Sequence, residues 1–469
     1  MANNCKIFTP NSYVAELLDA VGYRAGLMGK SILENSCGEG NILTEIVRRY
    51  IQDAQLNNKT HQEIKLGLER DICGFELEQS HADRCRDNLA VEAGKLGIEG
   101  VKWNIVCQNY LRTDLKRKFS YIIGNPPYIV YRDIDRNERG YLKEKFETCR
   151  EGKFDYYYAF IEKSIRNLDE NGEMAYIIPN SIYKNVYAAL LREYIKPFLK
   201  GIYDYTILNK FPGTTISSTI LLIKKKETCH FFYCDVVEGK KVQIKKEDLG
   251  EKWIFTEKKS AGKKIRFGSW FQVTNTVATL CNDAFLLENY KRENGCYVLP
   301  DGDKVEEDIV NPALSRKRGK RECAIIFPYY YNNGILSHYT EEEFERYFPF
   351  ATVHLQKFSA KLEKRAADRS AKWFEYGRSQ ALDKIQYRKA VIPSILSSSI
   401  HVTITQENVV PCAGVIITER GERKLEEAKK ILESREFYEY LKEIGIFTTG
   451  KSRRLTVKDI ENYTFDSWK

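Results

Sequence analysis

The sequence has no long apolar run, no export signal and no metal-binding cysteine pattern. No stretch approaches the roughly 18 uninterrupted apolar residues that a membrane-spanning helix needs, and the opening MANNCKIFTP lacks the basic-then-apolar order of a signal peptide. The 12 cysteines are scattered singly, without a CxxC pair or a Cys/His cluster at zinc spacing. These absences predict a soluble cytoplasmic protein with reduced thiols and no metal site.

Glycine and proline are too scarce for a fibrous or low-complexity protein, at 29 and 12 of 469 residues. With 43% hydrophobic and 30% charged residues, the composition is that of an ordinary globular chain. The length is about three times the usual domain size of roughly 150 residues, which predicts two domains or more. A net charge of +9 is compatible with a polyanionic partner but does not establish one.

Short apolar runs alternate with polar helical stretches through residues 1–225, which predicts a doubly wound α/β sheet. The alternation dissolves after the basic run Lys224–Lys226, so we expect a domain boundary near Lys226 and a second domain over residues 226–469. The expected strands are Ser31–Glu34, Ile72–Phe75, Asn104–Cys107, Tyr121–Ile123, Ala175–Ile178, Tyr205–Leu208 and Thr219–Ile223.

Polar and small residues follow the first three expected strands. The first strand runs into a turn with Gly38 and Gly40, which let a ligand approach the backbone closely, although such a turn alone is more often without a ligand. The second strand ends at Glu76, which could accept both hydroxyl protons of a ribose, and the third at Asn109, whose amide could hydrogen-bond an adenine ring. Together these strand ends predict a site for an adenosine moiety.

The segment Asn125-Pro126-Pro127-Tyr128 comes directly after the fourth expected strand. Two prolines fix the backbone and remove two amide donors, so carbonyl oxygens there can point away from the sheet. The amide oxygen of Asn125 and the carbonyl oxygen of Pro126 could then accept two hydrogen bonds from one exocyclic amine, while Tyr128 stacks on the ring that carries it. A rigid turn beside an aromatic is the alternative, and the place directly after a buried strand disfavours it.

With these motifs the chain resembles the gamma class of S-adenosylmethionine-dependent N6-adenine DNA methyltransferases. Phe8-Thr9-Pro10 resembles motif X and precedes the glycine turn, as in that class, and a large second half follows. The resemblance implies a class I methyltransferase sheet followed by a mixed α+β target-recognition domain. It also implies S-adenosylmethionine as cofactor, double-stranded DNA as substrate, and a monomer in a bacterial or archaeal restriction-modification system.

The resemblance carries over to individual residues of the first domain. Asn109 stands where the family usually has Asp, and Asn35-Ser36 departs from the family's Pro-x-Cys-Gly form. Phe154–Tyr158 and Gly172–Pro179 resemble motifs V and VI. The implied cofactor residues are Thr9, Pro10, Glu34, Cys37, Gly38, Gly40, Glu76, Leu77, Asn109, Tyr110 and Asn125, and the implied catalytic residues, which hold the target adenine, are Asn125, Pro126, Pro127, Tyr128 and Phe211.

The second half resembles recognition domains more loosely, through Trp373–Gln380 and Thr449–Arg454. Its candidate DNA contacts are Arg378, Gln380, Arg453, Arg316, Lys317 and Arg318, each of which taken alone is about as often a solvated surface charge. A long charged helix is expected over Glu419–Lys442, where it packs with one apolar face.

Other functions stay open. The NPPY segment also occurs in methyltransferases that act on RNA or on protein amides, but the order of motifs and the large second half favour DNA. An inactive DNA-binding specificity protein is disfavoured by the intact glycines, Glu76 and NPPY. We expect modification without cleavage, because the catalytic domain starts by residue 8 and the second half shows no paired-acid-plus-lysine nuclease site. A separate endonuclease partner is left open.

Overall fold

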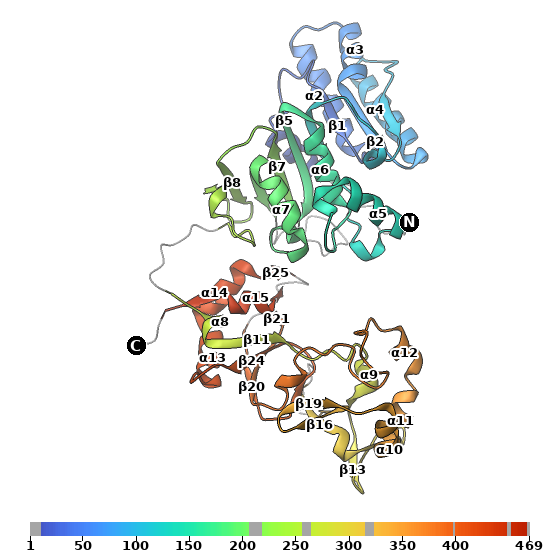
Figure 1. The fold of residues 1–469 in the computed structure, drawn as a ribbon. Helices are drawn as coiled ribbons and strands as arrows, with labels where there is room; N and C mark the ends of the chain where they lie inside the picture. Colours follow the sequence, from blue (N-terminus) through green and yellow to red (C-terminus); the bar gives the residue numbers. More distant parts are fainter. Residues whose placement is uncertain are drawn as a thin grey trace. The chain divides into compact units, whose positions relative to one another are not determined.

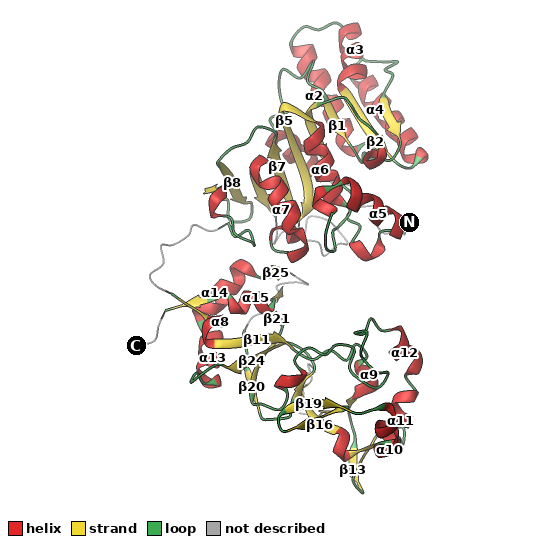
Figure 2. Cartoon of the chain, in the orientation of Figure 1, coloured by secondary structure: helices red, strands yellow, loops and turns green. Residues whose placement is uncertain are grey.

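The computed structural model describes residues 11–205, 218–255, 264–314, 323–396, 399–447 and 452–466. The chain forms two compact units, Met1–Glu257 and Lys258–Lys469, each with its own sheets and hydrophobic clusters (Figures 1 and 2).

A nine-stranded sheet forms the centre of the first unit, in the order β3-β2-β1-β4-β5-β7-β6-β8-β9. Strands β1 to β5 run parallel, and β7 is antiparallel between β5 and β6. This is the doubly wound α/β sheet that the sequence predicts. The strands are β1 Ile32–Glu34, β2 Ile72–Glu76, β3 Asn104–Cys107, β4 Phe119–Gly124, β5 Leu168–Pro179, β6 Leu199–Asp204, β7 Ser218–Lys224, β8 His230–Asp235 and β9 Lys240–Lys245.

Helices cover both faces of this sheet, which is why its central strands are apolar at successive positions. Ile32 and Ile123 face one hydrophobic cluster with α1 to α4, while Leu33 and Ile122 face the other with α5, α6 and α7. The helices are α1 Asn11–Ala20, α2 Asn41–Leu56, α3 His61–Asp71, α4 Gln79–Lys95, α5 Arg136–Lys145, α6 Tyr157–Asn167 and α7 Ala189–Ile195.

The first unit extends beyond the boundary expected near Lys226. Strands β8 and β9 continue the sheet from β6, and Phe231 and Ile244 join the core beneath α7, so the units divide between Glu257 and Lys258. The sequence missed this hairpin because edge strands are covered less completely and are therefore more polar. Of the twelve residues in β8 and β9, Phe231 and Ile244 are the buried ones.

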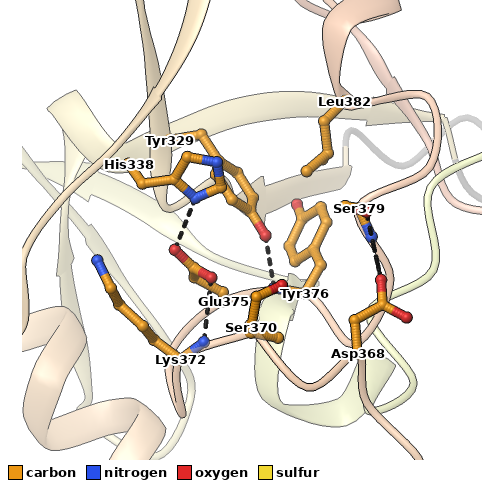
Figure 3. Close-up of a pocket in the computed structure, with 10 residues that line it drawn as sticks. Tyr329, His338, Asp368, Ser370, Lys372, Glu375, Tyr376, Ser379 and Leu382 are labelled. Carbon is orange, nitrogen blue, oxygen red and sulfur yellow. Dashed lines mark hydrogen bonds and ion pairs between the residues drawn. The ribbon is translucent and has the colours of Figure 1, made fainter.

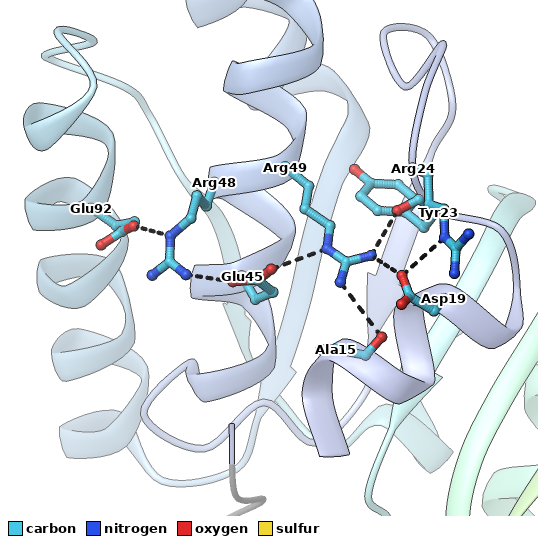
Figure 4. Close-up of polar contacts among 8 residues, drawn as sticks. All are labelled: Ala15, Asp19, Tyr23, Arg24, Glu45, Arg48, Arg49 and Glu92. Carbon is cyan, nitrogen blue, oxygen red and sulfur yellow. Dashed lines mark hydrogen bonds and ion pairs between the residues drawn. The ribbon is translucent and has the colours of Figure 1, made fainter. Parts of the chain in front are cut away.

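A chain of ion pairs joins α1, α2 and α4 on one face of the first unit (Figure 4). Arg49 of α2 donates to Asp19 of α1 at 2.7 Å and to Glu45 at 3.0 Å. Arg48, its neighbour, donates to Glu45 and to Glu92 of α4, each at 2.6 Å. Because these charges are shared among three helices, they fix the helix that follows the glycine turn relative to its neighbours.

The second unit is a mixed α+β assembly of short strands, as the family resemblance implies. One antiparallel sheet has the order β11-β24-β20-β22 and another the order β12-β17-β16-β23. Their strands are β11 Phe271–Asn275, β24 Val415–Glu419, β20 Lys389–Ile392, β22 Thr403–Thr405, β12 Leu286–Leu287, β17 Cys323–Ile326, β16 Val310–Leu314 and β23 Val410–Pro411.

Smaller sheets and short helices complete the second unit. The remaining strands are β10 Ile265–Arg266, β13 Lys291–Glu293, β14 Cys296–Val298, β15 Lys304–Glu306, β18 Tyr329–Asn332, β19 Ile335–His338, β21 Ile395–Leu396, β25 Ile446–Phe447, β26 Arg453–Arg454 and β27 Thr464–Phe465. The helices are α8 Phe267–Trp270, α9 Asn282–Phe285, α10 Glu341–Tyr347, α11 Pro349–Gln356, α12 Ser359–Lys364, α13 Leu425–Leu432, α14 Arg435–Ile444 and α15 Val457–Glu461.

The single charged helix expected over Glu419–Lys442 is two helices. α13 ends before Ser434, whose hydroxyl accepts a hydrogen bond from the amide of Phe437 at 3.1 Å and so caps a new helix, α14. Glu419 itself belongs to strand β24. Across the described residues, no helix combines the length and the apolar character that a membrane crossing requires.

Candidate active site

The predicted motifs of the first unit meet at one edge of its sheet. Because β1 to β5 are parallel neighbours, their carboxyl ends lie together, and each motif follows one of these ends. Sequence positions far apart are therefore brought to a common place.

The turn after β1 depends on two glycines for different reasons. Gly40 has φ 89°, and a Cβ there would lie 2.7 Å from the Cys85 sulfur, so this glycine lets α4 come close. Gly38 has φ 54°, and a Cβ there would meet no atom within 4 Å, so its outer side is open. The amide of Cys37 donates to the carbonyl oxygen of Phe75 at 2.9 Å and ties the turn to β2. The open side of Gly38 is where a ligand can approach the backbone.

Glu76, at the end of β2, is fixed against this turn. One carboxylate oxygen accepts from the amide of Gly38 at 2.9 Å, and the other from the amides of Leu77 and Glu78 at 2.8 and 3.0 Å. The side chain of Leu77 is 54% exposed beside it. A preoriented carboxylate next to an exposed apolar side chain suits a ribose and the ring attached to it.

Glu34 and Cys37 lie beneath the turn. Glu34 is 3% exposed, and its burial raises the pKa of the carboxyl well above its usual range. Its Oε2 atom has no hydrogen-bond partner among the described residues. A hydrogen bond with Cys85, together with burial, raises the pKa of the Cys37 thiol. The Cys37 thiol therefore keeps its proton at pH 7, and Glu34 offers a polar atom without a partner below the turn.

After β3, the Tyr110 side chain does not lie at the cofactor edge where the family resemblance places it. Asn109 Oδ1 accepts from the amide of Leu111 at 2.9 Å and caps a short helix. The Tyr110 ring is 2% exposed and packs between Phe75 and Phe160, so it lies in the core and not at the open edge. This happens because α6 covers the end of β3. Tyr110 supports the site from below, and Asn109 stays half-buried beside the edge.

The NPPY segment follows β4 and is held by its own tyrosine. The Tyr128 hydroxyl lies 2.5 Å from Asn125 Oδ1 and 2.7 Å from the carbonyl oxygen of Ile177 in β5. Tyr157 meets the Tyr128 ring edge-on, with centroids 5.8 Å apart. Burial raises the pKa of Tyr128 well above its usual range, so the hydroxyl keeps its proton. Pro126 is buried, whereas Asn125, Pro127 and Tyr128 are half-buried.

Ser36 connects the glycine turn to the NPPY segment, and Asn35 connects it to α6 and β5, roles that the sequence did not assign. The Ser36 hydroxyl donates to the carbonyl oxygen of Asn125 at 3.3 Å. The Asn35 amide donates to Ser164 at 2.8 Å and to Tyr176, and these two hydroxyls are 2.7 Å apart. The departure from the family's Pro-x-Cys-Gly form was the signal that these positions have a polar role.

The candidate DNA residues of the second unit are partly engaged within it. Arg378 donates to Asp368 at 2.6 Å and leaves 43% of its side chain exposed. Gln380 donates to the carbonyl oxygen of Thr276 at 2.7 Å, and Arg453 is half-buried in β26. Thr9, Pro10, Phe211, Arg316, Lys317, Arg318 and residues 449–451 lie outside the described residues.

A cavity of about 270 Å³ lies beside the Trp373–Gln380 segment. Figure 3 shows His338 turned toward Glu375, 2.8 Å apart, and the Tyr329 hydroxyl accepting from the amide of Tyr376 at 2.8 Å. The amide of Lys372 donates to the other Glu375 oxygen at 3.0 Å. Hydrogen bonds to Glu375 and Tyr376 therefore hold this segment in place. In the described parts of the chain, no cluster of His, Cys, Asp and Glu is arranged to hold a metal ion.

The sheet order, with β7 antiparallel between β5 and β6, and the motifs at its carboxyl edge define the class I methyltransferase fold. Residues 44–209 match the Eco57I restriction-modification methylase family. This match agrees with the resemblance carried by the NPPY segment, which lies within the matched residues.

The chain is also similar in sequence to two characterised restriction-modification proteins. It is 23% identical to the type II restriction enzyme and methyltransferase RM.Eco57I of Escherichia coli, over 63% of this chain and 34% of that protein. It is 28% identical to the type II methyltransferase M.PaeR7I of Pseudomonas aeruginosa, over 47% of this chain and 40% of that protein. The chain therefore matches less than half the length of either relative.

The likeness to a solved structure continues into the second unit. The type IIL restriction-modification enzyme MmeI, solved in complex with DNA, superimposes with a TM-score of 0.62 over 96% of this chain and 64% of MmeI, at 15% identity. A methyltransferase sheet followed by smaller antiparallel sheets is thus an arrangement shared by both proteins.

Proposed function

We propose that this protein is a site-specific DNA methyltransferase that methylates N6 of an adenine extruded from double-stranded DNA. The observation that supports it best is the NPPY segment, which lies at the same sheet edge as the glycine turn and is joined to it by the Ser36 to Asn125 hydrogen bond. The methyl acceptor and a nucleotide-like cofactor would therefore meet between these two segments.

S-adenosylmethionine fits the residues at this edge. Gly38 offers open backbone, the Glu76 carboxylate is preoriented for ribose hydroxyls, Leu77 is exposed for the adenine ring, and Asn109 lies half-buried at the neighbouring strand end. When bound there, the cofactor supplies an electrophilic methyl group on a sulfonium. We assign further cofactor contacts to Thr9, Pro10, Glu34, Cys37, Gly40 and Asn125.

The NPPY segment would make the adenine amine a better nucleophile. The amine's lone pair is conjugated into the ring, and two acceptors, Asn125 Oδ1 and the Pro126 carbonyl oxygen, would draw its two N–H groups away from the ring plane. The lone pair is then localised and aimed for in-line attack, an effect of orientation and electrostatic stabilisation. The amine releases its proton after the methyl arrives, so no general base is required.

The target base must leave the duplex, at a cost of a few kcal/mol of pairing and stacking. Tyr128, and Phe211 on the other side, would recover part of this energy by stacking on the extruded adenine.

The second unit would select the site, with Arg378, Gln380, Arg453, Arg316, Lys317 and Arg318 as candidate base or phosphate contacts. We expect a monomer that acts in the cytoplasm of a bacterial or archaeal cell and modifies without cleaving, with or without a separate endonuclease.

The test is to express the full chain in a host free of N6-methyladenine and to sequence the modified bases. One adenine context methylated throughout the genome is expected, together with transfer of labelled methyl from S-adenosylmethionine to duplex DNA in vitro. Unmodified host DNA together with labelled RNA or protein would favour the other NPPY chemistries. Specific DNA binding without any methyl transfer would identify a specificity protein instead.

A further inference from the structure

Two apolar side chains project into solvent between β5 and α7. Val186 and Tyr187 are each 47% exposed, whereas Ile182, Tyr183 and Ala188 on either side of them are buried. We call Val186 and Tyr187 the tip. Two adjacent exposed apolar side chains are a candidate contact surface when they lie beside a functional site, and the position of the tip decides whether they do.

The segment that carries the tip is held in place by buried groups. Arg192 is 3% exposed, and its guanidinium donates to the carbonyl oxygens of Ile182 and Asn185 at 2.6 and 2.7 Å. The Asn185 side chain accepts from the amide of Tyr187 at 3.1 Å. A buried guanidinium bound to loop carbonyls fixes the loop before any partner arrives, which reduces the entropy lost on binding.

The tip lies at the same sheet edge as the NPPY segment. It follows Pro179 at the carboxyl end of β5, and the Tyr128 hydroxyl reaches the carbonyl oxygen of Ile177 near that end. The loop that precedes α6 comes to this edge as well, since the amide of Tyr156 donates to the carbonyl oxygen of Ile129 at 2.8 Å. Helices α6 and α7, which begin after these two segments, pack on each other (Figure 1).

One lysine lies beside the tip. The ammonium group of Lys153 lies 6.0 Å from the centroid of the Tyr187 ring. Within the described parts of the chain, no carboxylate forms an ion pair with Lys153. Its loop also contains Arg150, which is 3.6 Å from Glu151. Glu151 balances the charge of Arg150, so Lys153 is the cation that remains beside the Tyr187 ring. A cation next to an exposed aromatic side chain suits DNA, in which phosphates surround stacked bases.

We propose that the tip contacts the DNA beside the extruded adenine and stabilises the flipped state. Tyr187 and Val186 would stack on the base step or the orphaned partner base, and Lys153 would bind a neighbouring phosphate. This rests on the proposed function, because it requires a duplex at the NPPY edge. It adds a DNA contact made by the catalytic unit itself, separate from site selection by the second unit.

The test compares Tyr187→Ala with the unaltered full chain on two duplexes of the site mapped by sequencing. In one, the target adenine is paired with thymine; in the other, it is opposite an abasic site. We expect Tyr187→Ala to lower kcat/KM on the paired duplex by about tenfold, in the range that loss of one stacking contact produces. On the abasic duplex the loss should be under about twofold, since no pairing has to be broken. Leu56→Ala, an exposed apolar residue at the end of α2, is the matched control and should leave both rates unchanged.

Three results would overturn the inference while leaving the proposed function intact. They are an unaltered rate on the paired duplex, an equal loss on both duplexes, or a change in hydrodynamic radius without a change in rate. The last would mean that the tip covers another part of this chain or a second copy of it. If the unaltered protein itself methylates neither duplex, the proposed function fails and not the inference alone. Lys153→Gln should flatten the salt dependence of DNA binding, and an unchanged slope would remove Lys153 from the DNA contact.

Discussion

The hydroxyl of Tyr128 lies between two acceptors, 2.5 Å from Asn125 Oδ1 and 2.7 Å from the carbonyl oxygen of Ile177. A hydroxyl carries one hydrogen, so it donates to one of them at a time. If an adenine amine takes Asn125 Oδ1, the Tyr128 hydroxyl still has the Ile177 oxygen. The exchange therefore leaves no buried donor unpaired, which would otherwise cost about 1–3 kcal/mol.

Replacing Tyr128 separates its ring from its hydroxyl. Tyr128→Phe keeps the stacking surface, so we expect kcat/KM within about threefold of the unaltered chain. Tyr128→Ala loses the surface and should cost about tenfold or more, as base–aromatic stacking contributes about 1–3 kcal/mol. Fluorescence of 2-aminopurine at the target position reports the flipped state in both variants. Equal losses in the two variants would show that the hydroxyl matters and the ring does not.

Asn125→Ala should reduce methyl transfer by at least about a hundredfold, because it removes one of the two proposed acceptors of the amine. Affinity for S-adenosylmethionine should fall far less than the rate of transfer, because Asn125 is only one of several proposed cofactor contacts, and calorimetry measures the affinity directly. Asn171→Ala, at an exposed position near the start of β5, is the matched asparagine control and should turn over normally. Near-normal turnover of Asn125→Ala would contradict the mechanism.

Glu76→Ala should weaken S-adenosylmethionine binding by about tenfold or more, since it removes a charged acceptor worth roughly 1.5–3 kcal/mol. The structure adds a second reason: the Gly38 amide loses its partner, and the glycine turn loosens. Titration calorimetry on the full chain gives the dissociation constant. Glu99→Ala, at an exposed position of the same unit, serves as the control. Unchanged affinity would remove Glu76 from the cofactor site.

Asp155, just before α6, provides a test by pH. Burial raises the pKa of its carboxyl to about 6, against 3.8 in the unfolded chain. The folded state therefore favours the protonated form, and the stability that this group contributes is full below pH 3.8 and is lost as pH rises through 6. Asp155→Asn should thus be more stable than the unaltered chain at pH 8, by about 2–3 kcal/mol, with the difference vanishing near pH 4. Urea unfolding at the two pH values measures it, and a pH-independent difference would contradict the raised pKa.

Truncation tests the division of the chain. Residues 1–257 retain all nine strands of the first sheet, whereas residues 1–225 lack β8 and β9 and expose the core around Phe231 and Ile244. We expect the longer piece to unfold cooperatively and bind S-adenosylmethionine without specific DNA affinity, and the shorter piece to be markedly less stable or insoluble. Thermal unfolding compares them. If the longer piece methylated the site as selectively as the full chain, the recognition role of the second unit would be wrong.

Local sequence patterns were sufficient to predict the first five strands, the glycine turn and the NPPY segment. Alternating apolar runs, the positive φ of Gly38 and Gly40, and the fixed backbone of Pro126 and Pro127 depend on residues close together in the chain. The parallel order of the strands then places their carboxyl ends at one edge, so the members of the candidate site were predictable although their contacts were not.

Only the tertiary structure decided which side chains face the open edge and which support it. Tyr110 is buried because Phe160 of α6 packs on the short helix that follows β3, and the β8–β9 hairpin belongs to the first sheet because β6 offers it an edge. The Ser36 to Asn125 bond joins residues 89 positions apart. Such contacts depend on how distant elements pack, and a side chain's local sequence carries no information about the partner that will be placed against it.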